Sequence, residues 1–176
     1  LYMYNDFQAC PFADTCRDVC LIQSGRAIFS KSIMDCRIRR HKAFIYDRPI
    51  FMRYCVSQVI RHYAKNRAYS KTSFRFNGTS DWHILRMPIT ITKSDSEYIL
   101  KAYKVYIEPV KYTNIIECLK NALDTKLNQS VGQKLYMYDY TKRPITDSDL
   151  KLAKKLNYHL TLSHGSKVDL FSIALK

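Results

Sequence analysis

The sequence predicts an α/β fold, in which mainly parallel strands form a partial (β/α) barrel-like sheet. Three runs have the composition of strands: TSFRF (72–76), KLYMYDY (134–140) and YHLTL (158–162). Helical spacing of apolar residues separates them, at 111–128 and 147–157. Strands that alternate with helices in this way are typical of parallel βα units. The 176 residues fit one domain with a core of its own.

Three segments make up this single domain (1–176): a cysteine-cluster segment (1–26), basic helices (27–70) and βα units (71–176). Apolar residues recur at helical spacing in 27–47 and again in 50–69. Pro49 lies in the first turn of the second helix, where proline is tolerated. The expected buried faces consist of Ile33, Met34, Ile38, Phe44 and Ile45 in one helix, and Phe51, Met52, Cys55, Val59 and Tyr63 in the other.

The remaining elements of the third segment follow from the same patterns. The stretch 83–110 is interpreted as β-rich, with "ITITK" and "YILKAYKVYIEPV" as candidate strands. Either Thr146 or Asp147 is expected to cap the helix at 147–157. The last residues, "KVDLFSIALK", favour a helix. The helix in 111–128 is expected to bury Ile115, Ile116, Leu119, Ala122 and Leu123.

Polar residues follow each of the three predicted strands. In α/β sheets the carboxyl ends of the strands line the ligand site, so we expect these residues to share a pocket. Asp81 and Asp139 are the candidate catalytic carboxylates, because paired carboxylates orient a substrate or move a proton. The alternatives are that Asp81 only caps a turn and that Lys142 is one more lysine of a basic chain. The candidate substrate-binding residues at the strand ends are Asn77, Thr79 and Lys142, with Ser80, Thr141, Ser163 and His164 nearby.

Three cysteines gather near the start of the chain, with the spacing Cys10-x5-Cys16-x3-Cys20. Three thiolates suit a [4Fe–4S] cluster with one iron left open for a small ligand. Zinc is the competing metal, with a histidine or Cys36 as fourth ligand. A disulfide or plain reduced thiols remain a third interpretation. Arg26, after a glycine, is a candidate for holding an anionic ligand near the cluster, or is a surface arginine.

The other cysteines and the histidines have mostly structural interpretations. Cys36, Cys55 and Cys118 occur in helical patterns, where a lone cysteine is typically a small buried hydrophobe. His159 is interpreted as a packed core residue, and His41 and His62 as solvated residues of basic helix faces. No role is assigned to His83, which follows Trp82 near the expected pocket.

The charge of the chain favours an anionic partner. There are 29 Lys and Arg residues against 15 Asp and Glu, a formal net charge of +14. Arg37, Arg39 and Arg40 are the candidate contacts to DNA or RNA phosphates. The Tyr- and Lys-rich stretch 98–114 has a second possible meaning, because rings beside cations suit stacking on single-stranded bases. Its alternative is a strand with tyrosines packed on one side and lysines solvated on the other.

Several of these motifs occur together in one known family. "CPFADTCRDVC", "SGR", "FRFNGTSDW", "MYDYTKRP" and "NYHLTLS" follow one another in this order. The series resembles the phage gene-product-88-like protein family, of which the chain would be a truncated or divergent member. The resemblance implies a phage or viral protein that works in the host cell cytoplasm, with other viral proteins as further partners. By analogy alone, a cysteine cluster followed by βα units also looks like radical S-adenosylmethionine architecture.

Two functions follow as hypotheses. The first is a phage-type iron–sulfur protein that acts on a nucleic-acid-related or anionic substrate, and whether it is an enzyme stays open. The second is a non-enzymatic, basic nucleic-acid-binding viral protein with a structural zinc site. No apolar run reaches the roughly 20 residues of a membrane span, and no secretory signal is visible. We therefore expect no membrane partner and a cytoplasmic location.

Overall fold

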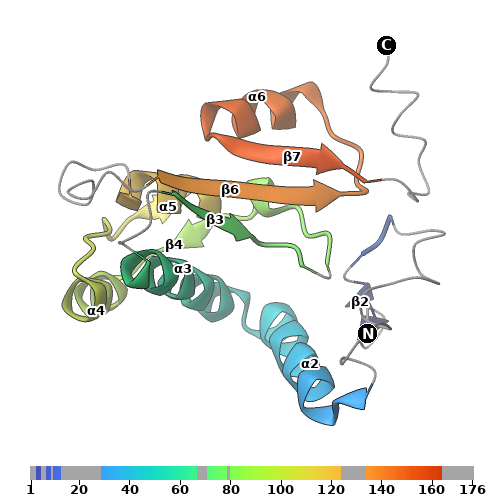
Figure 1. The fold of residues 1–176 in the computed structure, drawn as a ribbon, viewed down its shortest axis with the longest axis horizontal. Helices are drawn as coiled ribbons and strands as arrows, with labels where there is room; N and C mark the ends of the chain where they lie inside the picture. The colour runs from blue at the N-terminus through green and yellow to red at the C-terminus, as the bar shows by residue number, and fades with distance from the viewer. Residues whose placement is uncertain are drawn as a thin grey trace.

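A three-stranded parallel sheet lies at the centre of the fold. The computed structural model describes residues 3–4, 7–8, 10–12, 29–66, 71–78, 80–123 and 134–163. Strands β3 (Lys71–Arg75), β6 (Lys134–Thr141) and β7 (Tyr158–Leu162) pair in the order β3-β6-β7, all parallel. Figure 1 shows their arrows pointing the same way. The α/β prediction is confirmed, although over these ranges the sheet does not close into a barrel.

Four further strands form two small antiparallel pairs apart from this sheet. Near the N-terminus, β1 (Met3–Tyr4) pairs with β2 (Phe7–Gln8). In the middle of the chain, β4 (Ile89–Thr90) pairs with β5 (Lys111–Tyr112). The predicted "ITITK" strand is therefore present only as the two residues of β4.

The two basic helices form close to the predicted bounds, but of the five residues expected on the buried face of the first only Phe44 is buried, and Ile33 is 37% exposed. Helix α2 (Lys31–Tyr46) is followed at once by α3 (Arg48–Lys65), and Pro49 lies in the first turn of α3. Proline fits there because the first backbone N–H groups of a helix have no partner within it. The buried residues of α3 are Met52, Val56, Val59, Ile60 and Tyr63, with Phe51 and Cys55 packed against the core.

The prediction of a strand at 98–110 is wrong. Helix α4 (Lys93–Tyr103) occupies its first half, and residues 104–110 form no strand, since β5 begins only at Lys111. Thr92 starts this helix with a reciprocal capping box: its hydroxyl accepts from the Asp95 backbone, and the Asp95 carboxylate accepts from the Thr92 backbone. The helix ends at Lys104, which has a left-handed conformation at φ 58°. The alternation of tyrosine and lysine in this stretch is typical of a strand, but the capping box of Thr92 and Asp95 starts a helix instead.

The remaining helices lie against the sheet. They are α5 (Ile115–Leu123), α6 (Asp147–Lys155) and the short 3-10 helix η3 (Ile84–Arg86). Thr146 caps α6 through a capping box with Asp149, which settles the choice between Thr146 and Asp147. Helix α5 buries all five residues that the sequence predicts for its inner face: Ile115, Ile116, Leu119, Ala122 and Leu123.

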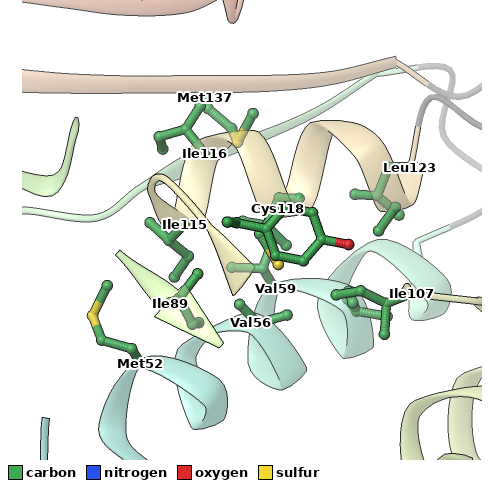
Figure 2. Packing of buried hydrophobic residues seen from close by; sticks show 14 of the residues in the cluster. Met52, Val56, Val59, Ile89, Ile107, Ile115, Ile116, Cys118, Leu123 and Met137 are labelled. Carbon is green, nitrogen blue, oxygen red and sulfur yellow. The ribbon is translucent and has the colours of Figure 1, made fainter. Parts of the chain in front are cut away.

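The hydrophobic core fills the space between α3 and the sheet, with α5 in between (Figure 2). Ile116 of α5 lies beside Met137 of β6, and Cys118 faces Val59 of α3. Ile116 and Cys118 are both completely buried. Full burial of an aliphatic side chain contributes about 1.5–3 kcal/mol.

Two histidine predictions are wrong. His41 is buried rather than solvated, because its ring packs edge-on against Trp82 where α2 meets the loop after β3. His159 is exposed rather than packed in the core, because its neighbour Tyr158 takes the inward position of β7. Of the cysteines, Cys118 is buried as predicted, whereas Cys36 and Cys55 are half-buried. Within the described parts of the chain, no helix is long and apolar enough to cross a membrane.

Candidate functional site at the carboxyl edge of the sheet

The polar residues after the three strands do meet at one edge of the sheet. The backbone N–H of Ser163, just after β7, donates to the Thr141 carbonyl at the end of β6 over 2.9 Å. Lys142 Nζ donates to the Ser163 hydroxyl over 2.8 Å. Asn77, just after β3, lies against Asp139 of β6. We call this group of strand-end residues the carboxyl edge. The strand-end residues that the structure describes therefore lie together, and the cavity that some of them line is described below.

Asp139 is the most buried acid at the carboxyl edge, with none of its surface exposed. Its two oxygens accept from the Asn77 backbone N–H at 2.9 and 3.0 Å, and from the Tyr158 hydroxyl at 2.9 Å. Arg75 Nε lies 3.6 Å away. Burial raises the pKa of Asp139 to about 6, although these hydrogen bonds and Arg75 act to lower it. A group with that pKa exchanges a proton close to neutral pH.

The side chain of Asp81 links the loop after β3 to the end of β6 and the loop that follows it. One of its carboxylate oxygens accepts from the Thr141 hydroxyl at 2.6 Å, and the other from the Lys142 backbone N–H at 3.0 Å. Arg143 Nη2 donates to the Asp81 carbonyl at 2.8 Å. The side chain is only 4% exposed. These contacts give Asp81 a positioning role, because they join its loop to the residues that follow β6.

Asn77 organises the loop between itself and Trp82. Its side-chain oxygen accepts from the Ser80 hydroxyl at 2.9 Å and from the Trp82 backbone N–H at 3.1 Å. Its side-chain amide donates to the Trp82 carbonyl at 3.0 Å. Short polar side chains often close turns in this way. The position of Trp82 therefore depends on Asn77, and Thr79 lies outside the described residues.

A small, partly open cavity lies behind these side chains. Its volume is about 30 Å³, and its lining includes Asn77, Asp81, Asp139, Thr141, Arg143 and Tyr158. A cavity of roughly 10–15 Å³ or more holds a water molecule, whereas pockets for small ligands measure about 300–1,000 Å³. This cavity has room for water only. A substrate would have to meet the carboxyl edge from its outer surface.

A third acid, Asp149, lies at the start of α6 near the same edge. It accepts from Arg86 at 2.8 Å, and His83 Nε2 lies 3.3 Å from the same oxygen. Burial alone would raise the pKa of Asp149, but hydrogen bonds from Thr146 and Arg86 and the charge of His83 hold it below its usual range. Burial lowers the pKa of His83, against the attraction of Asp149. His83 thus has a structural partner that the sequence did not reveal.

The cysteine-cluster segment reaches the carboxyl edge at its beginning. Phe12, two residues after Cys10, lies under the Arg143 guanidinium, 4.9 Å from ring centre to Cζ. Figure 1 places the blue N-terminal strands on the side to which the arrows of β6 and β7 point. Cys10 is half-buried. Cys16, Cys20 and Arg26 lie outside the described residues.

Arg143, at the carboxyl edge, has a hydrogen-bond donor that lacks an acceptor. Its Nε is buried and has no hydrogen-bond partner among the described residues. A buried donor without a partner costs about 1–3 kcal/mol, so such groups point to a water, an ion or a ligand. No three His, Cys, Asp or Glu side chains within the described ranges lie close enough to hold a metal ion. Two of the three predicted thiol ligands fall outside those ranges.

The predicted nucleic-acid contacts lie on α2. Arg39 and Arg40 are exposed, and Arg37 is half-buried. Phe44 lies one turn after Arg40 on the same helix, and its ring stacks on the Trp82 ring with centres 3.6 Å apart. Helix α2 therefore contacts the loop after β3, whose Trp82 is hydrogen-bonded to Asn77 of the carboxyl edge.

Four residues of the carboxyl edge were not predicted from the sequence: Arg75, Trp82, Arg143 and Tyr158. Their roles depend on strand order and register, which place Tyr158 beside Met137 and Asp139 beside Leu160. One sequence signal could have identified Arg143: it directly follows the candidate residue Lys142 at the end of a predicted strand. Comparison with protein-family models, curated proteins and solved structures finds no match for the chain.

Proposed function

We propose that the protein is a phage-type iron–sulfur protein, in which Cys10, Cys16 and Cys20 supply the thiolates of a [4Fe–4S] cluster at the carboxyl edge. The observation that carries this proposal is the contact between Phe12 and Arg143. It brings the start of the cysteine-cluster segment to the strand ends, which is where α/β sheets bind their ligands. The buried, unused Nε of Arg143 is a second reason to expect a ligand here.

The residues of the edge suit an anionic ligand group. A cluster held by thiolates carries negative charge, which the guanidinium of Arg143 and the ammonium of Lys142 would attract. When bound, the cluster would supply an open iron for a small ligand, such as S-adenosylmethionine by analogy. Asp139 is the residue proposed to hold or release a proton, because its pKa is about 6. Asp81 is proposed to keep Lys142 and Arg143 in place.

Metal analysis after purification without oxygen tests the proposal. We expect about four irons and four sulfides per chain, and their loss when Cys10, Cys16 and Cys20 are all replaced by serine. Cys55→Ser is the matched control, because Cys55 is a half-buried thiol on α3 outside the cluster spacing. One zinc per chain without sulfide would make the site structural. Absence of any metal would refute the cluster.

The midpoint potential of the cluster tests its proposed position. Arg143→Gln removes a positive charge from the carboxyl edge, and a cluster beside it should then be harder to reduce. We expect a more negative midpoint potential with unchanged iron content. Lys151→Gln, an exposed lysine of α6, serves as the control of equal charge. An equal potential in both variants would place the cluster elsewhere.

A second function, nucleic-acid binding by α2, is supported by the exposure of Arg39 and Arg40 in a chain of net charge +14. Each phosphate contact contributes about one to the slope of log affinity against log salt. The double variant Arg39→Gln, Arg40→Gln should therefore reduce this slope by about two for duplex DNA. The matched control is Lys151→Gln with Lys154→Gln on α6, which should leave the slope unchanged. Equal slopes in all proteins would exclude α2 as the contact.

A further inference from the structure

A larger groove lies between α3 and α4, on different elements from the carboxyl edge. Its volume is about 300 Å³, ten times that of the small cavity at the carboxyl edge. This volume is at the lower end of the range for small-ligand sites, about 300–1,000 Å³. Its lining includes Arg53, Tyr54, Ser57 and Gln58 from α3, and Asp95 and Tyr98 from α4. Neither proposed function uses this groove.

Two tyrosine rings in the groove have large exposed surfaces. Tyr54 of α3 and Tyr98 of α4 are each 58% exposed. In contrast, Tyr63 of α3 and Tyr112 of β5 are only 3% and 5% exposed and belong to the core. Core packing therefore does not account for Tyr54 and Tyr98. Exposed rings that line a groove are suited to stacking on a flat partner.

A set of hydroxyl groups links the two helices beside these rings. The Tyr98 and Tyr103 hydroxyls are hydrogen-bonded to each other, and Ser57 of α3 is bonded to Tyr103. The bond to Tyr103 raises the pKa of Tyr98, and the bond to Tyr98 lowers the pKa of Tyr103. The Tyr98 ring also packs edge-on against the Tyr103 ring of the same helix, with centres 6.1 Å apart. A ring that is already held in place loses little conformational entropy when a ligand stacks on it.

The charges at the groove favour an anion. Arg61 lies close enough to act on both Tyr98 and Tyr103, and Lys65 acts on Tyr103. The lining carboxylate, Asp95, is paired with Arg53 over 3.2 Å and also accepts hydrogen bonds within its capping box. Because its charge is balanced there, the cations Arg61 and Lys65 remain to attract a phosphate.

We propose that the α3–α4 groove binds one nucleotide of a single-stranded nucleic acid, with its base against Tyr54 and Tyr98 and its phosphate beside Arg61. The two exposed rings provide the stacking surface, and the volume fits a single nucleotide. The cations supply charge complementarity, as is usual in single-strand binding sites. The inference shares its class of partner with the second proposed function, but it rests on other residues than those of α2.

Binding of a short fluorescent oligothymidylate to the full chain, followed by anisotropy, tests this inference. The double variant Tyr54→Ala, Tyr98→Ala should weaken binding about fivefold or more, because stacking on one base contributes at least roughly that factor. The double variant with phenylalanine should bind nearly as well as the wild type, since it keeps both rings. Tyr106→Ala is the matched control, a 41% exposed tyrosine outside the groove lining.

Duplex DNA separates this inference from the α2 proposal. We expect the groove variants to lose single-strand binding while their duplex binding stays unchanged. Loss of both duplex and single-strand binding in the Arg39→Gln, Arg40→Gln variant, with single-strand binding unchanged in the double alanine variant, would support α2 without the groove. Equal single-strand affinity of the wild type and the double alanine variant, or an equal loss with Tyr106→Ala, would overturn the inference. So would a wild-type chain that does not bind the oligothymidylate. Circular dichroism confirms that each variant is folded.

Discussion

Replacement of Asp139 by alanine is expected to lower the free energy of unfolding by about 3–5 kcal/mol. The carboxylate is completely buried and accepts from the Asn77 backbone and the Tyr158 hydroxyl. Alanine would leave both donors buried without an acceptor, and each such donor costs about 1–3 kcal/mol. It would also leave Arg75 without its nearest acid.

Urea denaturation of the two proteins measures this effect. Tyr158→Phe is the matched variant, because it removes one donor and keeps the ring that β7 packs inward. We expect it to cost only about 1 kcal/mol, since the acid keeps its bonds to Asn77. Asp147→Ala, an exposed acid in the first turn of α6, should change stability little. A loss below that of Tyr158→Phe would mean that Asp139 does not hold the strands β3, β6 and β7 together.

The second large effect concerns pH. Burial raises the pKa of Asp139 from its ordinary value of 3.8 to about 6 in the folded state. Between these two values the folded state binds more protons than the unfolded state, so stability decreases as pH rises. The contribution is present in full below pH 3.8 and is lost as pH passes 6. A shift of about two pKa units corresponds to about 3 kcal/mol.

A difference between two proteins isolates this contribution. His41 and His83 have pKa values lowered by burial, so they act in the opposite direction over part of the same range. Asp149, whose pKa is lowered, affects stability only at more acidic pH. The stability of the wild type minus that of Asp139→Asn should fall between pH 4 and 6 and stay constant above pH 7. A difference that does not change with pH would show that Asp139 has an ordinary pKa.

The carboxyl edge could be predicted from the sequence because it follows from chain order. Strands separated by helices pair in parallel, so residues after β3, β6 and β7 must meet at one side. This argument placed Asn77, Asp81, Asp139 and Lys142 together without any knowledge of distances. What it could not supply was the register that brings Tyr158 to Asp139. The distinction between a substrate pocket and a water-sized cavity likewise depends on side-chain packing.

The errors have local physical causes. The strand expected at 98–110 rested on the spacing of tyrosine and lysine, whereas the capping box at Thr92 and Asp95 starts a helix. After that helix, Val105 and Ile107 are buried and Tyr106 is exposed, so the alternating pattern applies only from residue 105 onward. His41 was assigned to solvent from its basic neighbours. Its burial depends on Trp82, a residue far away in the sequence.

The stack of Phe44 on Trp82 provides an optical probe inside the protein. Trp82 is the sole tryptophan of the chain, so its indole emission comes from one place, the junction of α2 with the loop that Asn77 holds. Undocking of α2 would expose the indole to water and shift its emission to longer wavelength. Unlabelled protein can thus report, in real time, whether the helix that carries Arg39 and Arg40 remains seated when an oligonucleotide is added.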